Sequence, residues 1–483
     1  MVRALAIDVG TSSVRTAIVD ETGVVSSLFQ QRLTITTPQP GEVELDADEI
    51  GRVVLELAAR TLAEAGGADV VGITNQRATT VVFDPATGRA VGPTLGWQDL
   101  RTVFDCLALQ EQGLRLAPNQ SATKLRWLIE HAQGPAREVR FATIETWIAW
   151  LLTRGEEHVT DHSNAAITGL VDIDVTTWHE PTLTALGIDP VVLPRIVPTI
   201  GPVATAHALA GDLTISALIG DQPASLFGQC CVTHGAKITF GTGAMLNMPR
   251  GPIGPSAMTR YDSGCFPVVV RSDATSVIWG VEGIVLSAGA AVDWAVEDLG
   301  IVESAAASDL LAASVTSSGG VTFVPALSGL GTPRWDFGAR GAFFGLTRGS
   351  GRAQMMRAVL EGVAQRGADL VEAALVETGN QLEEVRVDGG MTANRTFLTL
   401  LADATGLPIA VSPEREATTR GAGLMALVGA GHLRVEEVEN MWHPTRVIEP
   451  TASDGVRAAR RADWANAVDR AAGTIPALSE IRF

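Results

Sequence analysis

The stretch ALAIDVGTSSVRTAIVD, residues 4–20, decides the fold. It consists of an apolar run, a Gly-Thr-Ser-Ser turn and a second apolar run, which is the pattern of a β-hairpin with a small-residue tip. The pattern returns in AKITFGTGAMLNM, residues 236–248. Two hairpins of one kind, one in each half of the chain, predict a duplicated architecture.

Strands and helices alternate after each hairpin. Residues 46–65 begin with Asp-x-x-Glu and continue with apolar residues at helical spacing, which predicts a capped amphipathic helix. ADVVGITNQ, residues 68–76, has the composition of a buried strand, and residues 352–375 predict a long helix. Residues 383–411 predict a strand, a glycine-rich turn, a helix and a strand. The alternation indicates an α/β protein.

We place the boundary between the two halves near residue 230, because no linker or low-complexity segment separates them. The predicted domains are residues 1–229 and residues 230–483, with a cleft between them. A chain of 483 residues is too long for a single core, which agrees with two domains.

Composition limits the partners. A formal net charge of −18 argues against a nucleic acid or an anionic membrane surface, although backbone amides can still hold phosphates on an acidic protein. The four cysteines have no metal-ligand spacing and predict reduced thiols. The sequence shows no leader-like start and no apolar run of membrane-spanning length. We therefore expect a cytoplasmic protein. Lys124 and Lys237, the only lysines among 36 basic residues, mark positions where arginine fits poorly.

Three small-residue turns form the main candidate site: Gly10-Thr11-Ser12-Ser13, Gly241-Thr242-Gly243 and Gly389-Gly390-Met391-Thr392. Glycines let backbone N–H groups approach phosphate oxygens closely, and neighbouring hydroxyls add donors. Any one of these segments alone is explained by a tight turn, but three at strand ends favour a nucleotide cleft. Their spacing matches neither the dinucleotide fingerprint nor the Walker pattern.

Two acids follow predicted strands. Asp8 stands just before the first turn, where a carboxylate is suited to hold a hydrated Mg²⁺ against phosphates, although a turn-forming aspartate is the alternative. Asp221 ends the apolar stretch ALIG, residues 217–220, and Pro223 behind it suits the start of a helix. Asp221 is therefore either a helix cap or an acid at the mouth of a cleft.

Eight ordered segments resemble the FGGY carbohydrate kinases, and within that family the glycerol kinases most. The segments are AIDVGTSSVR (6–15), ITNQRATT (73–80), GWQDLRT (96–102), NQSATKLRW (119–127), IGDQPASLFGQ (219–229), ITFGTGAML (238–246), residues 324–349 and VRVDGGMTANRTFLTLLAD (385–403). The resemblance covers essentially the whole chain. It implies the actin/hexokinase-type fold, in which two RNase H-like domains close over ATP and a sugar or polyol, and a homo-oligomer such as a dimer.

The resemblance also implies roles for single residues. Asp221 matches the general base that takes the proton of the substrate hydroxyl, and Asp8 matches the acid near Mg²⁺. Arg77, Trp97 and Gln222 match the substrate pocket. The positions that match contacts to the phosphates and the nucleotide of ATP are Thr11, Ser12, Ser13, Arg15, Thr242, Gly289, Gly390 and Asn394.

Three pocket positions depart from the glycerol kinase pattern. Ala78 stands where those kinases have a glutamate, Asn119 where they have a tyrosine and Met245 where they have a phenylalanine. An unreplaced carboxylate is expected to cost about 1–3 kcal/mol of glycerol binding. We expect an ATP-dependent kinase for glycerol or a glycerol-like polyol, with a longer polyol or ketose such as erythritol, a pentitol or xylulose as the alternative.

Two functional classes other than a kinase are compatible with this fold. A non-catalytic sensor of nucleotide or polyol would be favoured by the loss of Asp8 or Asp221, but both are present. An actin-like or chaperone-like ATPase would have no use for the substrate-side segments at 96–102 and 121–127. The segment VTDHSNA, residues 159–165, contains a histidine that we interpret as structural.

Overall fold

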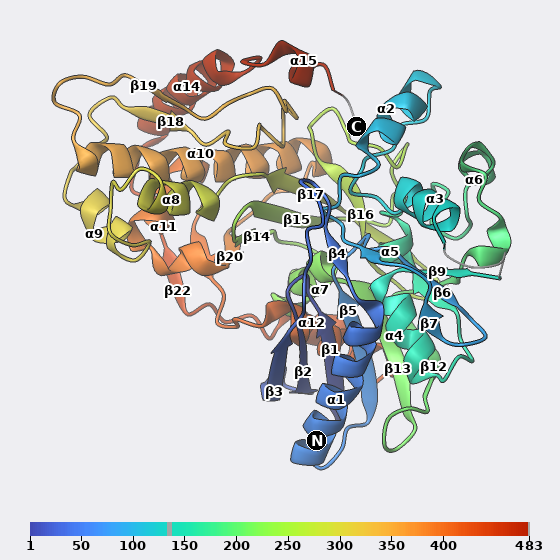
Figure 1. Ribbon diagram of the computed structural model, residues 1–483. Helices are drawn as coiled ribbons and strands as arrows, with labels where there is room; N and C mark the ends of the chain where they lie inside the picture. Colours follow the sequence, from blue (N-terminus) through green and yellow to red (C-terminus); the bar gives the residue numbers. More distant parts are fainter. Residues whose placement is uncertain (133–137, 482–483) are drawn as a thin grey trace.

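The computed structural model describes residues 1–132 and 138–481 (Figure 1). The first half is built around a six-stranded sheet with the order β12-β13-β5-β1-β2-β3. Its strands are β1 (Arg3–Val9), β2 (Ser13–Asp20), β3 (Val25–Arg32), β5 (Val70–Asn75), β12 (Ile200–Ala206) and β13 (Leu213–Gly220). β1 pairs antiparallel with β2 and parallel with β5, which confirms the hairpin predicted for residues 4–20.

The second half contains a seven-stranded sheet with the order β16-β17-β15-β14-β20-β21-β22. Its strands are β14 (Lys237–Phe240), β15 (Ala244–Gly251), β16 (Phe266–Ser272), β17 (Val277–Val285), β20 (Val385–Asp388), β21 (Ile409–Val411) and β22 (Arg446–Ile448). The run β17-β15-β14-β20-β21 repeats the run β3-β2-β1-β5-β13, with β14 antiparallel to β15 and parallel to β20. The strand order thus confirms the predicted duplication.

Helices cover both faces of the first sheet, because alternate residues of β1 point to opposite sides. Leu5 and Ile7 pack in one cluster with α1 (Ala47–Ala65) and α4 (Ile144–Leu152). Ala4 and Ala6 pack in another with α7 (Asp221–Gly228) and α12 (Ala417–Gly429). The predicted cap of α1 is present, since the side chain of Asp46 accepts from two backbone N–H groups of the first turn.

The second sheet packs with α8 (Gly289–Glu297), α10 (Arg352–Thr378) and α11 (Arg395–Thr405) in the largest apolar core. The smaller elements of the first half are β4 (Glu44–Leu45), β6 (Val81–Asp84), β7 (Arg89–Ala90), β8 (Thr94–Leu95), α2 (Val103–Glu111), α3 (Ala122–Glu130), β9 (Arg140–Ala142), β10 (Val159–Asp161), α5 (His162–Ala165), α6 (Glu180–Leu186), η1 (Pro190–Val192) and β11 (Arg195–Val197). Those of the second half are α9 (Ala307–Ala313), β18 (Thr322–Val324), β19 (Ala342–Phe344), η2 (Gly390–Ala393), α13 (Val435–Glu439), α14 (Asp454–Ala471) and α15 (Pro476–Ser479).

The two halves are joined where α7 crosses α12. Each helix follows the last parallel strand of its own sheet, and α12, from the second half, lies among the elements of the first half (Figure 1). A Cβ added to Gly228 would lie 1.8 Å from the carbonyl oxygen of Ala417, and one added to Gly421 would lie 1.8 Å from that of Ala224. Only glycine permits this approach of the two helix backbones.

No helix within the described ranges, 1–132 and 138–481, has both the length and the apolar composition needed to cross a membrane.

Candidate active site

Asp221 lies where β13 passes into α7. The helix begins at Asp221 itself, two residues before the proline that was expected to open it. The cap position belongs to Gly220, and no side chain caps this helix, so the structure does not support the interpretation of Asp221 as a helix cap. The carboxylate Oδ1 accepts from the backbone N–H of Gln222 at 2.8 Å, and 32% of the side chain is exposed. Asp221 is therefore an accessible acid at a strand end.

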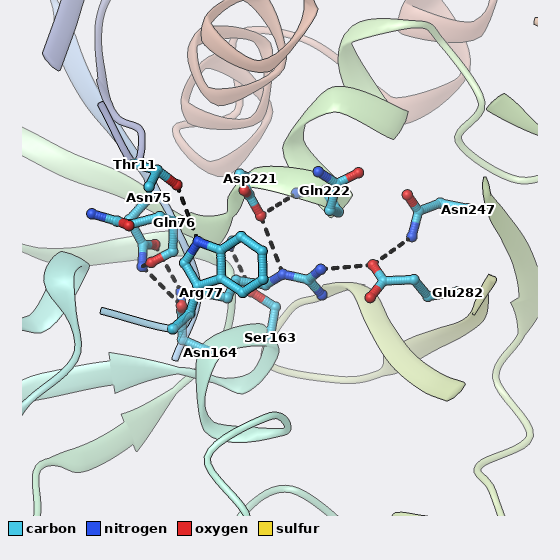
Figure 2. A network of polar contacts seen from close by, with 12 residues as sticks. Thr11, Asn75, Gln76, Arg77, Ser163, Asn164, Asp221, Gln222, Asn247 and Glu282 are labelled. Carbon is cyan, nitrogen blue, oxygen red and sulfur yellow. Dashed lines mark hydrogen bonds and ion pairs between the residues drawn. The ribbon is translucent and has the colours of Figure 1, made fainter. Parts of the chain in front are cut away.

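Arg77 holds Asp221 from the neighbouring strand end. Its Nε lies 3.2 Å from Oδ1 of Asp221, and its Nη2 lies 2.7 Å from Oε2 of Glu282 on β17 (Figure 2). The same Glu282 oxygen accepts from Nδ2 of Asn247 on β15 at 3.0 Å. Arg77 thus bridges one carboxylate from each half of the chain. Glu282 and Asn247 were not among the residues predicted from the sequence.

The charges around Asp221 oppose one another. Desolvation raises the pKa of Asp221, and the positive charge of Arg77 lowers it. The carboxylate of Glu282 adds to the rise, while the ammonium of Lys237 counters it. The balance leaves the pKa above its usual value. A carboxylate with such a pKa takes up a proton more readily than an ordinary aspartate, as a general base must.

Gln222 is held by a buried lysine. Nζ of Lys237 donates to Oε1 of Gln222 at 2.8 Å and to the hydroxyl of Thr239 at 3.0 Å. Lys237 is fully buried on β14, and desolvation lowers its pKa, against the opposing effect of the carboxylate of Asp388. The predicted pocket residues Asp221, Arg77 and Gln222 are therefore brought together.

Trp97, a predicted residue of the substrate pocket, contacts the first phosphate turn, residues 10–13. Its indole Nε1 donates to Oγ1 of Thr11 at 3.1 Å (Figure 2). Its backbone N–H donates to Oγ1 of Thr79. The preceding carbonyl, of Gly96, accepts from Nζ of Lys124 at 2.8 Å. Both lysines singled out in the sequence thus contact the candidate site or the residue next to it.

Asp8 lies at the end of β1 and is only 3% exposed. Its Oδ2 is 3.7 Å from Nη1 of Arg15 and accepts from the hydroxyl of Thr419 on α12 at 3.0 Å. Burial raises the pKa of Asp8 to about 6, although Arg15 and Thr419 oppose the rise. Arg15 also pairs with Glu416, which precedes α12, so this cluster joins both halves.

The remaining first-turn residues differ in exposure. Ser12 is exposed, whereas Ser13 opens β2 as a buried residue whose hydroxyl accepts from Gln30. The hydroxyl of Ser13 is therefore engaged within the fold, whereas Ser12 remains exposed for contact with a phosphate.

The predicted nucleotide residues lie on the second half. The turn that contains Thr242 abuts the start of α8, where the N–H of Gly289 donates to the carbonyl of Gly241 at 2.9 Å. Gly390 is exposed on η2. Asn394 caps α11 by accepting from Phe397, and its Nδ2 donates to Ser308. Asn394 is thus already engaged within the protein.

The three positions that depart from the glycerol kinase pattern do not form one cluster of polar contacts. Ala78 is buried with a left-handed φ of 60°, and its carbonyl accepts from Ser121 of the loop that carries Asn119. Asn119 is exposed and has no side-chain hydrogen bond within the described residues. Met245 lies half-buried on β15. A hollow of about 450 Å³ beside Trp127 contains none of the predicted site residues.

The segment 159–165 forms hydrogen bonds with the ends of β5 and β13, the two strands that lead to Arg77 and Asp221. Asn164 and Asn75 exchange two amide hydrogen bonds of 3.0 Å, and the hydroxyl of Ser163 accepts from the N–H of Gly220 (Figure 2). Both strand ends that carry Arg77 and Asp221 are therefore tied to this one turn. His162, interpreted as structural, pairs with Ser272.

Comparisons with known proteins agree on one family. The description "FGGY family of carbohydrate kinases, N-terminal domain" matches residues 3–228, and the corresponding C-terminal domain matches residues 236–430. Glycerol kinase from Dechloromonas aromatica is 39% identical over 96% of this chain and 97% of its own. Glycerol kinase from Aromatoleum aromaticum is 39% identical over 98% of this chain and 99% of its own.

Solved structures show the same fold. Plasmodium falciparum glycerol kinase with ADP superimposes with a TM-score of 0.89 at 26% identity, covering 100% of this chain and 99% of that one. A xylulose kinase from Lactobacillus acidophilus gives a TM-score of 0.86 at 20% identity, over 98% of this chain and 99% of that one. The predicted fold, two RNase H-like domains of the actin/hexokinase type, is confirmed.

Proposed function

This chain belongs to the FGGY family of carbohydrate kinases, and from that membership we propose that it transfers the γ-phosphoryl group of ATP to a hydroxyl of glycerol or a glycerol-like polyol. The observation that carries the proposal is the grouping of Asp221, Arg77 and Gln222 at two neighbouring strand ends. Trp97 adds to it, because its indole reaches Thr11 of the first phosphate turn and so joins the substrate side to the phosphate side.

The residues have separate tasks in this reaction. Asp221 accepts the proton of the attacking hydroxyl through its raised pKa, which keeps the oxygen nucleophilic while phosphoryl transfer proceeds. Arg77 holds the carboxylate and offers its guanidinium to a substrate hydroxyl. Gln222 offers its amide to a second hydroxyl, and the apolar ring of Trp97 faces the carbon chain. Arg15 is available to offset charge on the transferring phosphoryl group.

The arrangement fits Mg²⁺ accompanying ATP. Asp8 presents a buried carboxylate oxygen beside the first turn, which is the donor type that Mg²⁺ prefers. Within residues 1–132 and 138–481 no group of three or more His, Cys, Asp or Glu could hold a metal ion. A site with one or two carboxylates is the usual one for Mg²⁺ that also binds phosphates and water. The ion would neutralise charge on the phosphates; Asp8 would hold it.

The relatives at 38–39% identity support the small polyol over the longer polyol or ketose. The test is coupled ADP release with MgATP and a panel of glycerol, erythritol, pentitols and xylulose. We expect glycerol to have the highest kcat/KM. A preference for a longer substrate would refute that choice, and ATP binding without turnover on any substrate would support the non-catalytic sensor.

The assembly and the location of the protein belong to the same proposal. We infer a homo-oligomer, with a dimer as the expected state, and a cytoplasmic enzyme. Sedimentation of the purified protein tests the first, and fractionation of the source cells tests the second.

A further inference from the structure

Three polar residues form a row across three adjacent strands of the second sheet. Lys237 on β14 lies opposite Asn247 on β15, and Asn247 lies opposite Glu282 on β17. Residues directly opposite each other in a sheet project to the same face, so the three side chains stand side by side. All three are nearly or fully buried. Such a row in an apolar sheet is costly unless each group has a partner.

The partners of the row are the two residues that flank Asp221. At one end Glu282 binds Nη2 of Arg77 at 2.7 Å, and Asn247 steadies the same carboxylate oxygen at 3.0 Å. At the other end Lys237 binds Oε1 of Gln222 at 2.8 Å. The row comes from the second half of the chain, whereas the residues it holds precede residue 230.

The contact with Lys237 also fixes which way the amide of Gln222 faces. An ammonium group has donors only, so the amide atom that faces Nζ must be the oxygen. Nε2 is then turned away from Lys237, and in the part of the chain that the structure describes it has no hydrogen-bond partner. Gln222 is thereby set as a hydrogen-bond donor to an oxygen atom of a ligand.

We propose that the row Lys237–Asn247–Glu282 positions the substrate pocket, with Glu282 holding Arg77 and Lys237 holding Gln222 on either side of Asp221. The proposal rests on the proposed kinase function and deepens it. These are positioning residues, because Glu282 and Lys237 act through residues that would touch the substrate and Asn247 acts through Glu282.

The experiment compares two variants of the full-length enzyme in the glycerol and MgATP assay. Glu282→Gln keeps the shape and removes the charge, and Lys237→Met keeps an apolar stem and removes the ammonium. We expect each to raise the KM for glycerol about tenfold, with the KM for MgATP within about twofold of wild type. Asp403→Asn is the matched control, because Asp403 is also a buried carboxylate of the second half that accepts several hydrogen bonds.

The pH profile separates positioning from a general loss of stability. The charged groups that act on Asp221 are Arg77 from the end of β5, Glu282 from β17 and Lys237 from β14, and Asp8 at the end of β1 interacts with it as well. Removing the negative charge of Glu282 lowers the pKa of Asp221, so the acid limb of kcat/KM moves to lower pH. Removing the positive charge of Lys237 moves that limb to higher pH. Arg77 and Asp8 are unchanged in both variants.

The outcomes are distinct. Opposite shifts of the acid limb, with raised KM for glycerol and an unchanged limb in Asp403→Asn, support the row. Unchanged KM in both variants, or shifts of the same sign, refute it while leaving the kinase function intact. A wild-type protein without polyol-dependent ADP release refutes the proposed function and the row together. Should Glu282→Gln fail to fold, Lys237→Met alone decides. A raised KM for glycerol with the acid limb of kcat/KM moved to higher pH supports the row, and any other result refutes it.

Discussion

Replacing Asp221 by asparagine separates its chemistry from its place in the fold. Asparagine keeps Oδ1, so the 3.2 Å contact from Arg77 and the 2.8 Å contact from the N–H of Gln222 both survive. Arg77 also retains Glu282 at 2.7 Å and is not left as an unpaired buried charge. The variant loses only the ability to take up the proton of the attacking hydroxyl.

The expected loss in kcat is about 10²–10⁴-fold, the range for a positioned general base. That corresponds to roughly 2.7–5.4 kcal/mol of transition-state stabilisation. The KM for glycerol should change little, because Arg77, Gln222 and Trp97 remain. Coupled ADP release and single-turnover measurements at saturating MgATP give both constants. A variant that retains kcat within tenfold of wild type would show that Asp221 is not the base.

The same variant has a predicted effect on stability. The folded-state pKa of Asp221 is raised, mainly by desolvation, so the folded protein favours the uncharged side chain. Wild-type stability therefore falls as the pH rises through that pKa, and the uncharged asparagine avoids the loss. Urea unfolding at pH 8 should give an unfolding free energy equal to or above that of wild type. A clearly less stable variant would contradict the raised pKa.

Three further predictions concern other parts of the molecule. Trp97→Phe removes the donor to Thr11 but keeps an aromatic ring, so the KM for glycerol should rise about twofold to tenfold without a change in melting temperature. An unchanged KM would show that the hydrogen bond from Trp97 to Thr11 does not contribute to glycerol binding. Gly421→Ala would place a Cβ 1.8 Å from a carbonyl oxygen of α7, and urea unfolding should show a loss of about 3 kcal/mol or more, whereas Gly455→Ala, in open space on α14, should gain about 0.5–1 kcal/mol. Equal effects of the two would argue against the tight crossing. Burial raises the pKa of Glu145 from 4.5 to about 7, so the folded state binds that proton more tightly than the unfolded chain does. Wild-type stability relative to Glu145→Gln should therefore increase as the pH falls from about 7 towards 4.5, and a difference that stays flat with pH would contradict it.

The sequence could predict what depends on local pattern. The hairpins at residues 4–20 and 236–248 and the capped helix at 47–65 were predictable because alternation and capping act between near neighbours. The crossing of α7 and α12 was not, because Gly228 and Gly421 meet only after both sheets have formed. For the same reason the sequence could not show that α12, from the second half, completes the core of the first sheet.

The residues of the candidate site likewise fall into those that the sequence predicted and those that it did not. Arg77, Asp221 and Gln222 were found through contiguous family segments, and the structure brings them together. Glu282 was missed although a signal existed: it is the only charged residue in the otherwise apolar segment 277–285. Lys237 was noticed only for the rarity of lysine. Its partner, Gln222, lies 15 residues earlier in the sequence, on α7. The two side chains meet only once β14 has taken its place in the second sheet.

The position of Arg77 between two carboxylates has a consequence for when Asp221 is most basic. Glu282 lies on β17 of the second sheet, and Asp221 begins α7 directly after β13 of the first sheet. Their shared contact with Arg77 therefore requires the two halves to be together. Were Glu282 withdrawn, Arg77 would be left to neutralise Asp221 alone, and the pKa of the base would fall. Charge interaction weakens with distance, and entry of water weakens it further. Lys237, also from the second half, opposes this rise, but its effect on the pKa of Asp221 is smaller than that of Glu282. We therefore expect an approach of the two halves to orient Arg77 and to raise the pKa of Asp221 together, a coupling between closure and chemistry that would limit transfer of phosphate to water.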